Sequence, residues 1–380
     1  METKKYRFDE VTINFDKKRI PLSSAQREKR QGTFRYYGAQ GVIDHVDDYI
    51  FDGTYLLIAE DGENLKSKKQ NIAQVVDGQF WVNNHAHIVQ GNEQCDTRFL
   101  CYLINSMDLS GYVTGSAQPK LSQANLNAVT LSLPTLAEQK RIVEYLYMLD
   151  QKIDVNRQIN DNLEQQARAY FQELFVDNSD SAWTLGTVSD LGAVVGGSTP
   201  SKSKPEYYTE DGIAWITPKD LSINKAKFIS HGENDITELG LKNSSASIMP
   251  EGTVLFSSRA PIGYIAIASG EVTTNQGFKS VVPKPEIGTA YVYYFLKYNL
   301  PVIEGMASGS TFKEVSGSTM KNVPAVIPDT ETLACFNDFC TPIFAQQRIL
   351  EEQNQSLAAL RDSLLPKLMS GEIDVSDIQL

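Results

Sequence analysis

Arginine, tyrosine and glutamine side chains are grouped with two glycines in the segment Arg35-Tyr36-Tyr37-Gly38-Ala39-Gln40-Gly41. A guanidinium or a carboxamide can hydrogen-bond to the edges of nucleic-acid bases, and glycines allow the backbone to approach a phosphate closely. We therefore expect a polar recognition loop at this point. The candidate contacts are Arg35, Tyr36, Tyr37 and Gln40.

A similar mixture occurs in the second half of the chain, at 196–204 (Gly-Gly-Ser-Thr-Pro-Ser-Lys-Ser-Lys) and 215–220 (Trp-Ile-Thr-Pro-Lys-Asp). One such stretch alone is usually a solvated turn. The presence of this kind of loop in both halves favours contacts with phosphates and base edges. The candidates here are Ser198, Thr199, Lys202, Lys204, Tyr207, Tyr208, Trp215, Thr217 and Lys219.

The segment 16–30 is locally basic, with six lysines and arginines against two acidic residues. A nearly neutral domain with one basic face can still bind phosphates, although weakly without a basic partner. The candidate contacts in this segment are Lys17, Lys18, Arg19, Ser23, Ser24, Arg27 and Arg30.

Two short polar segments correspond at an offset of 191 residues, 83–87 (Asn-Asn-His-Ala-His) and 274–278 (Thr-Asn-Gln-Gly-Phe). This alignment makes Asn84 and Asn275 equivalent. A shared asparagine can either hold a turn or read a base, and the sequence supports the two roles equally. The remaining candidate contacts are Asn84, His85, Lys120, Arg259, Asn275, Gln276 and Lys313.

Common catalytic signatures do not occur. Gly-Lys and Gly-x-Ser-x-Gly are absent, which argues against a Walker A loop and a serine hydrolase. His85 and His87 could offer two metal ligands, but no acidic or cysteine cluster completes a site, so we expect hydrogen bonding and no metal. Glu138-Gln139-Lys140 resembles a nuclease motif, yet its place at a helix start indicates capping. The four cysteines form no CxxC pair and suggest reduced thiols in a cytoplasmic protein.

The second half of the chain repeats the first. Residues 115–122 recur as 309–316 at an offset of 194, and 97–103 recur as 289–295 at an offset of 192. Short apolar runs bounded by glycine, such as 55–59 and 253–256, are typical of strands. The repeat predicts a pseudo-symmetric molecule, which suits a roughly two-fold ligand such as duplex DNA.

Each repeat ends at a proline, Pro134 or Pro328, and a long helical pattern follows. We expect an α+β protein with two mixed α/β recognition domains, 1–134 and 179–328, separated by two long antiparallel coiled-coil helices in 135–178 and 329–380. Thr135 and Glu138 form a capping box, whereas Asp329 or Thr330 caps the second helix.

Apolar residues in both helical segments follow a 4-3 spacing, which is typical of a coiled-coil seam. The alternative is that each helix packs only on its own domain. A helix of about 40 residues spans ~60 Å, which suits a spacer. The predicted seam comprises Ile142, Leu146, Leu149, Ile153, Asn160, Leu163, Phe336, Cys340, Ile343, Leu350, Asn354 and Leu357.

The net charge of −12 is concentrated in these helices. The segments 135–178 and 329–380 carry nine of the twelve excess negative charges, so the two globular segments are nearly neutral. Acidic helices suit protein partners better than DNA. No apolar run is long enough to cross a membrane, and the polar N-terminus predicts no secretion signal.

Nearly the whole chain resembles the specificity (S) subunit of type I restriction–modification systems. Leu133-Pro134-Thr135-Leu136-Ala137-Glu138-Gln139 is similar to the family's Pro-x-x-x-Glu-Gln junction into the central helix, whereas Pro328-Asp329-Thr330-Glu331-Thr332-Leu333 lacks Glu-Gln. The other stretches that carry the resemblance are 19–24, 27–32, 37–41, 57–62, 196–200, 215–220, 259–263, 274–277 and 309–316.

The resemblance implies a non-catalytic subunit in which each recognition domain reads one half of a bipartite, asymmetric target in double-stranded DNA. The helices would fix the gap and dock two adenine-N6 methyltransferase subunits, and two restriction subunits can join. The chain itself would hold no cofactor. S-adenosylmethionine would bind the methyltransferase partner, and ATP and Mg would bind the restriction partner.

Two other classes of function compete with this interpretation. A nuclease would need a carboxylate–metal cluster, which the sequence does not offer. A rod-like protein-interaction adaptor without sequence-specific DNA binding would need only the helices.

Overall fold

The computed structural model describes residues 2–67, 70–115, 118–309 and 313–373. The chain divides into two compact units, one of 1–152 with 356–380 and the other of 153–355. Each unit contains one predicted recognition domain, called domain 1 and domain 2 below, together with parts of both long helices.

Domain 1 is built from short strands that form sheets with the orders β2-β9-β6-β7, β4-β3-β8-β5 and β1-β10. Single 3-10 turns lie at Phe8–Glu10, Asp16–Lys18 and Ser110–Tyr112. Its elements are β1 (Lys4–Arg7), β2 (Thr12–Asn14), α1 (Ser24–Glu28), β3 (Gln31–Gly38), β4 (Gly41–Val46), β5 (Phe51–Asp52), β6 (Tyr55–Ala59), α2 (Asn64–Ser67), β7 (Ala73–Val76), β8 (Gln79–Val82), β9 (Ala86–Gly91), α3 (Thr97–Ser106), α4 (Gln123–Asn127) and β10 (Thr130–Leu133).

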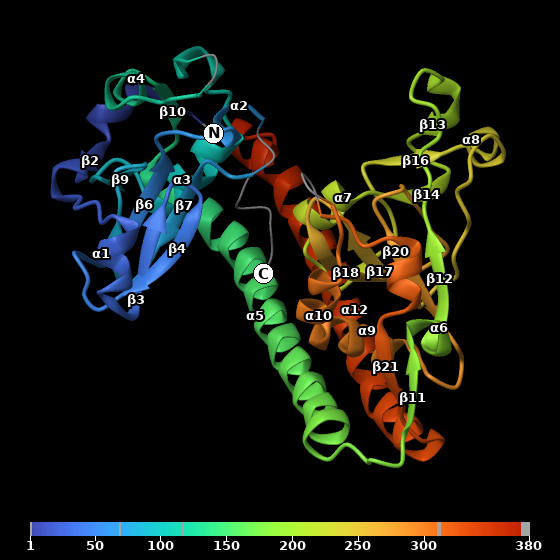
Figure 1. Ribbon diagram of the computed structural model, residues 1–380. Coiled ribbons are helices and arrows are strands. Elements are labelled where there is room, and N and C mark those ends of the chain that lie inside the picture. Colours follow the sequence, from blue (N-terminus) through green and yellow to red (C-terminus); the bar gives the residue numbers. More distant parts are fainter. Residues whose placement is uncertain (1, 68–69, 116–117, 310–312, 374–380) are drawn as a thin grey trace. The chain divides into compact units, whose positions relative to one another are not determined.

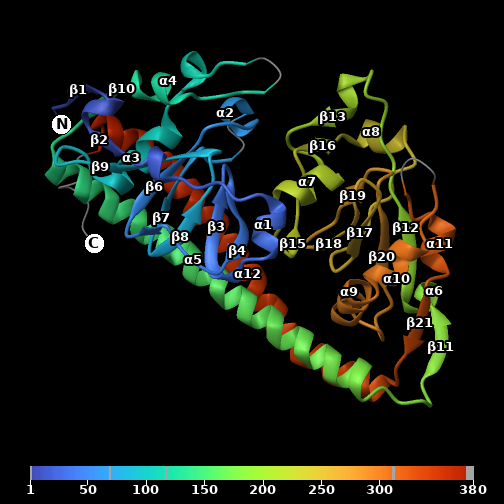
Figure 2. The same ribbon diagram turned by 60° about the vertical axis from the view of Figure 1, so that its left-hand side comes forward.

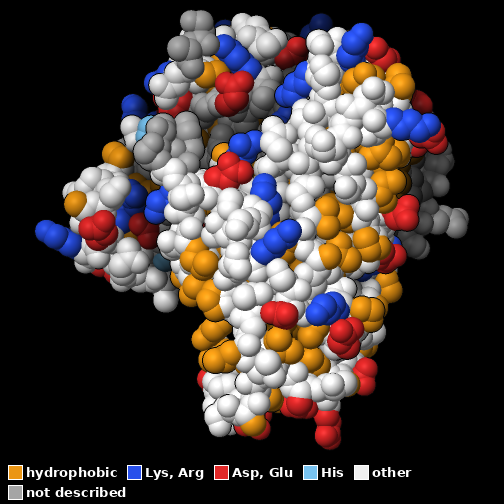
Figure 3. Space-filling view, turned by 45° about the vertical axis from the view of Figure 1, so that its right-hand side comes forward, with side chains coloured by type: hydrophobic (Ala, Val, Ile, Leu, Met, Phe, Trp, Pro, Cys, Tyr) orange, Lys and Arg blue, Asp and Glu red, His pale blue; other side chains and the backbone are white. Residues whose placement is uncertain are grey.

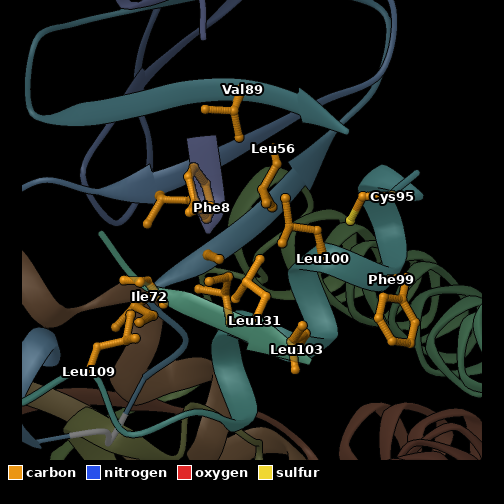
Figure 4. Packing of buried hydrophobic residues seen from close by; sticks show 14 of the residues in the cluster. Phe8, Leu56, Ile72, Val89, Cys95, Phe99, Leu100, Leu103, Leu109 and Leu131 are labelled. Atoms are coloured by element: carbon orange, nitrogen blue, oxygen red, sulfur yellow. The ribbon is translucent and has the colours of Figure 1, made fainter. Parts of the chain in front are cut away.

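The core of domain 1 lies between the β6–β9 sheet and α3. Leu56 and Val89 from the sheet face Leu100 and Leu103 of α3, and Phe8 fills the space beside them (Figure 4). The helix has apolar residues at i, i+3 and i+4, so one face of α3 is buried. This packing fixes the loops at the ends of β6 and β9.

Domain 2 has the same construction. Its sheets have the orders β12-β20-β17-β18-β15 (Figure 2), β13-β16-β14-β19 and β11-β21 (Figure 1), and a 3-10 turn lies at Pro205–Tyr207. Its elements are β11 (Thr184–Thr187), α6 (Val188–Leu191), β12 (Gly192–Gly196), β13 (Tyr208–Thr209), β14 (Ile213–Ile216), α7 (Pro218–Ile223), β15 (Phe228–Ile229), β16 (Asn234–Ile236), α8 (Glu238–Lys242), β17 (Val254–Ser258), β18 (Ile262–Ala268), β19 (Thr273–Thr274), β20 (Lys279–Pro283), α9 (Thr289–Tyr298), α10 (Leu300–Gly305), α11 (Gly317–Lys321) and β21 (Pro324–Ile327).

The internal repeat is confirmed in the folded chain. The short helices α4 and α11 begin 194 residues apart, and the hydroxyls of Ser122 and Ser316 cap them in the same way. In each domain the first strand pairs antiparallel with the last, β1 with β10 and β11 with β21. Each domain therefore closes on itself just before a long helix begins.

The two long helices are α5 (Leu136–Gln172), which continues into a π turn at Glu173–Asp177, and α12 (Thr330–Ser370). The predicted capping box is present, because Thr135 N–H donates to Glu138 Oε2 at 2.9 Å and Glu138 N–H donates to Thr135 Oγ1. At the second helix Asp329 is the cap, with Thr332 N–H donating to its Oδ1 at 2.9 Å. These backbone and side-chain hydrogen bonds lower the pKa of Asp329 to about 2.

The residues of the predicted seam are buried or half-buried, and those at its ends belong to the domain cores. The fully or largely buried members are Ile142, Leu146, Ile153, Phe336, Cys340, Ile343 and Leu350, whereas Leu149, Asn160, Leu163, Asn354 and Leu357 are half-buried. Ile142 and Leu146 pack in the core of domain 1 beside Leu368 of α12. Phe336 and Cys340 pack in the core of domain 2 beside Phe171 of α5. Packing on a domain and pairing of helices therefore share the same stripe.

Candidate nucleic-acid interface

The first predicted loop is mostly a strand. Arg35, Tyr36 and Tyr37 lie within β3, and the turn that joins β3 to β4 contains Gln40. Tyr36 is fully buried, and its hydroxyl accepts a hydrogen bond from Leu22 N–H at 2.8 Å. Tyr37 is 4% exposed. Tyr36 packs with Val46 and Trp81, and Tyr37 packs in a second cluster that contains Phe51 and Phe80, which removes both tyrosines from the set of surface contacts.

Arg35 and Gln40 remain at the surface. The Arg35 guanidinium donates to the Asp77 carbonyl at 2.7 Å and lies over the Tyr37 ring. Gln40 donates to Asn64 Oδ1 at 3.1 Å.

The arginines of the basic segment are held by acceptors of their own domain. Arg19 donates to the Ala86 carbonyl at 2.7 Å and to Glu60 at 3.1 Å, and only 15% of its side chain is exposed. Arg27 pairs with Asp44, and Arg30 pairs with Asp47 while lying over Trp81. These three arginines stabilise the fold, so Lys17, Lys18 and Ser24 are the more accessible candidates of this segment. Ser23 is the N-cap of α1.

The equivalent asparagines are Asn83 and Asn275, not Asn84 and Asn275. Asn83 Oδ1 accepts from His85 N–H at 2.8 Å, and Asn275 Oδ1 accepts from Gly277 N–H at 2.8 Å. The offset is therefore 192, and the predicted alignment was wrong by one residue. Both side chains hold a turn, whereas Asn84 is exposed.

In domain 1 these turns bring several predicted residues together at the ends of β6 and β9. Glu60 pairs with Lys120 at 3.2 Å, and Asp61 lies 2.7 Å from Nδ1 of His85. More than half of the Lys120 and His85 side chains is exposed, at 55% and 52%. This arrangement places two cationic or polar groups over two carboxylates.

His87 lies buried next to this region and hydrogen-bonds to residues that adjoin it. Its ring is buried, with Nδ1 2.6 Å from Asp16 and Nε2 2.8 Å from the Leu121 carbonyl. Burial alone would raise the pKa of Asp16, but hydrogen bonds from His87 and Ile88 N–H outweigh it and lower that pKa. Within the described residues there is no group of three His, Cys, Asp or Glu side chains suited to a metal ion.

In domain 2 the candidates meet at the end of β12 and of β14. Trp215 Nε1 donates to the Ser198 carbonyl at 3.0 Å, Thr199 donates to Gln276, and the Tyr208 hydroxyl donates to the Pro200 carbonyl at 2.6 Å. Trp215 is 6% exposed and so supports the loop instead of facing solvent.

The other candidates of this half differ in their availability. Thr217 caps α7 by bonding to Asp220, and Lys219 pairs with Glu233. Tyr207 is half-buried, while Lys202 and Lys204 are exposed, the latter 3.7 Å from Glu206.

Arg259 follows β17 and contacts Glu314 at 3.4 Å, and Lys279 reaches the same carboxylate at 3.7 Å. Lys313 is exposed beside them. The neighbouring Ser116, Ala117, Ser310, Thr311 and Phe312 of the two predicted repeat segments lie outside the described residues.

Polar residues also occupy the centre of the helix seam. Asn156 Nδ2 donates to Asn354 Oδ1 at 2.9 Å, and Gln347 Nε2 donates to the Asn160 carbonyl at 3.1 Å. Such bonds form in one helix register only, so they specify how α5 and α12 pair.

Sequence reasoning missed a buried lysine that joins domain 2 to these helices. Lys227 Nζ donates to Gln347 Oε1 at 2.6 Å, contacts Glu164 and lies 4.3 Å from the centre of the Phe344 ring. Burial raises the pKa of Glu164, but the charges of Lys227 and Lys297 overcome it and lower that pKa to about 2. Nothing in the residues around Lys227 marks it, because its partners are 63 or more positions away.

Two equivalent tyrosines anchor the domains to the helix pair. Tyr102 of α3 donates to Asp150 at 2.5 Å, and Tyr294 of α9, 192 residues later, donates to Glu164 at 2.8 Å. Both acceptors lie on α5. Arg361 of α12 pairs with the same Asp150.

Charges of both signs are interspersed over the surface, as Figure 3 shows for one face. This agrees with nearly neutral globular segments and with binding through local groups. Among the described residues there is no helix that is long and apolar enough to span a membrane.

Two segments of the chain, residues 2–165 and 180–360, match the profile of the type I restriction modification DNA specificity domain. The specificity subunit of the type I restriction enzyme MjaIX of Methanocaldococcus jannaschii is 41% identical over 191 residues, which is 48% of this chain and 44% of that protein. The specificity subunit of the HindI enzyme of Haemophilus influenzae is 24% identical over 404 residues, covering 85% and 84%.

A solved structure shares the fold. The S subunit of a type I restriction-modification system from M. genitalium superimposes with a TM-score of 0.58 at 16% identity, covering 97% of this chain and 96% of that one.

Proposed function

This chain belongs to the family of type I restriction-modification DNA specificity proteins, and we propose that it selects the DNA target of such a system. Each domain reads one half of a bipartite, asymmetric sequence in double-stranded DNA. The observation that carries this proposal is the duplication of one domain frame with different exposed side chains, such as Lys120 in one copy and Glu314 in the other.

The helices α5 and α12 fix the gap between the half-sites and dock the other subunits. Support comes from the polar pairs Asn156–Asn354 and Asn160–Gln347, which set the register of the seam. The acidic helices suit two adenine-N6 methyltransferase subunits, and restriction subunits can join the complex. We place this assembly in the cytoplasm, where its DNA lies.

The chain contributes recognition and no chemistry of its own. S-adenosylmethionine would be bound by the methyltransferase partner, and ATP and Mg by the restriction partner.

The experiment is to co-express the chain with its neighbouring methyltransferase gene in a host without other DNA methylation and to map N6-methyladenine. One two-part motif with a fixed gap is expected. Absence of methylation, together with failure of the two proteins to co-purify, would favour an adaptor without sequence-specific DNA binding. Mg-dependent cleavage by the chain alone would instead indicate a nuclease.

A further inference from the structure

The loops that follow β6 in domain 1 and β17 in domain 2 are built on one hydrogen-bonded frame. Glu60 N–H donates to the His85 carbonyl at 2.9 Å, and Ser258 N–H donates to the Gly277 carbonyl at 2.7 Å. Leu121 N–H donates to the Glu60 carbonyl at 2.8 Å, just as Val315 N–H donates to the Ser258 carbonyl at 3.0 Å. The matching turns of Asn83 and Asn275 complete the frame.

The frame identifies which side chains are equivalent, and their charges are reversed. Asp61 follows Glu60, as Arg259 follows Ser258, so an acid in domain 1 stands where domain 2 has a base. Lys120 and Glu314 precede the matched residues Leu121 and Val315. At this position domain 1 has the base and domain 2 has the acid. The backbone of Lys120 forms an isolated antiparallel β-bridge with Thr114, and the backbone of Glu314 forms the equivalent β-bridge with Ser308.

Each set of charges is paired within its domain and is partly open to solvent. In domain 1 Lys120 pairs with Glu60, and His85 with Asp61. In domain 2 Arg259 and Lys279 share Glu314. Arg259 is 39% exposed, and its contact with Glu314 engages Nη1, so the guanidinium can donate further hydrogen bonds to a ligand.

The hydrogen-bonding character of the two sets therefore differs. Domain 1 offers a carboxylate acceptor, because Asp61 engages Nδ1 of His85 through Oδ2 and a carboxylate can accept several hydrogen bonds. Carboxylates repel phosphates, so this set suits the edge of a base. Domain 2 offers the donor groups of a guanidinium.

Building on the proposed function, we infer that these sets read opposite patterns in the two half-sites. Arg259 reads a guanine, whose O6 and N7 accept two hydrogen bonds from a guanidinium in the major groove. Asp61, which His85 holds in place, reads the exocyclic amino group of an adenine or a cytosine, which is a donor. The two half-sites would thus differ in sequence because equivalent positions of the two domains carry opposite charges.

The test uses the full chain co-expressed with its methyltransferase, with the wild-type motif established first. Arg259→Lys keeps the charge but loses the paired bonds, and Arg259→Ala loses both. We expect each variant to lower selectivity for one guanine by about 10- to 100-fold, leaving the gap and the other half-site intact. Asp61→Asn with His85→Ala should relax one adenine or cytosine in the opposite half-site. Arg7→Ala, an exposed arginine of domain 1 that pairs with Asp9 and is not a candidate contact, is the matched control and should keep the motif.

Relaxation at a base other than guanine in the Arg259 variants, or in both half-sites, would overturn the inference. Uniform loss of methylation in Arg259→Lys, with no base relaxed, would also overturn it and make Arg259 a phosphate contact or a structural residue. A wild-type chain that yields no two-part motif would refute the proposed function itself, and the inference would fall with it.

Discussion

The side-chain amide of Asn156 on α5 donates a hydrogen bond to Oδ1 of Asn354 on α12, at 2.9 Å, at the polar centre of the seam. Asn156 is fully buried, and its own Oδ1 is buried without a partner. Burying a polar oxygen without a hydrogen bond lowers stability, and an apolar pair of similar size would avoid this loss. We therefore explain the two asparagines by their effect on helix register and not by a gain in stability.

This relationship predicts a non-additive effect of two substitutions. Asn156→Leu alone should lower the free energy of unfolding by about 1–2 kcal/mol, because Asn354 loses its partner. Asn156→Leu with Asn354→Leu should restore the wild-type value or exceed it. Urea denaturation followed by circular dichroism measures both. A double variant less stable than the single one would contradict a role in register.

The buried cluster around Glu164 predicts a specific dependence on pH. The folded pKa of Glu164 is about 2 against an ordinary 4.5, so this carboxylate stabilises the fold above pH 4.5 and loses its contribution as the pH falls towards 2. Burial lowers the pKa of its partner Lys227, so the contribution belongs to Glu164 and not to the whole cluster. At about 1.4 kcal/mol per pKa unit, the contribution is about 3 kcal/mol.

Glu164→Gln should therefore be less stable than wild type at pH 7 and lose less stability between pH 4.5 and 2. The midpoints of urea denaturation, measured for both proteins from pH 2 to pH 7, test this prediction. Asp161→Asn, one turn away at an exposed position, is the control and should follow the wild-type curve. Parallel curves for wild type and Glu164→Gln would show that the cluster does not act through this carboxylate.

Lys313 is an exposed lysine next to the charge set of domain 2 and should contact a phosphate. Lys313→Ala should weaken binding of the methyltransferase complex almost equally for target and scrambled duplexes. The slope of log binding constant against log salt should fall by about one. Fluorescence anisotropy at several salt concentrations measures this. Loss confined to one base position would instead indicate base reading.

The spacer role of the helices predicts a change of gap. A seven-residue insertion in each helix, after Asn156 and after Asn354, keeps the 4-3 pattern and adds ~10 Å of helix. This equals about three base pairs of DNA at about 3.4 Å each. Methylation mapping should show a lengthened gap or no methylation. A four-residue insertion, which breaks the seam, is the control, and an unchanged gap in the seven-residue variant would refute the spacer.

The hydrophobic periodicity and the internal repeat were enough to predict much of the fold from the sequence. The seam from Ile142 to Leu357 could be predicted because a 4-3 pattern is local. The repeat located α3 and α9 at the offset of 192 that the structure has.

The candidate site was harder to predict for physical reasons. Tyr36 looked like a surface contact because its burial depends on β4 and β8, which the segment itself does not reveal. Arg19 looked free because its acceptors at Glu60 and Ala86 are far away in the chain. Asn84 was paired with Asn275 because a one-residue shift in a loop is visible only from hydrogen bonds such as that of Asn83.

Exchange of domain 1 tests the central claim most directly. Residues 1–134 would be replaced by the matching segment of a relative with a different target, and the hybrid co-expressed with the same methyltransferase. Mapping of N6-methyladenine should then show one changed half-site, with the other half-site and the gap retained. A hybrid that changes both half-sites, or that changes neither, would contradict two domains reading DNA independently on a shared pair of helices.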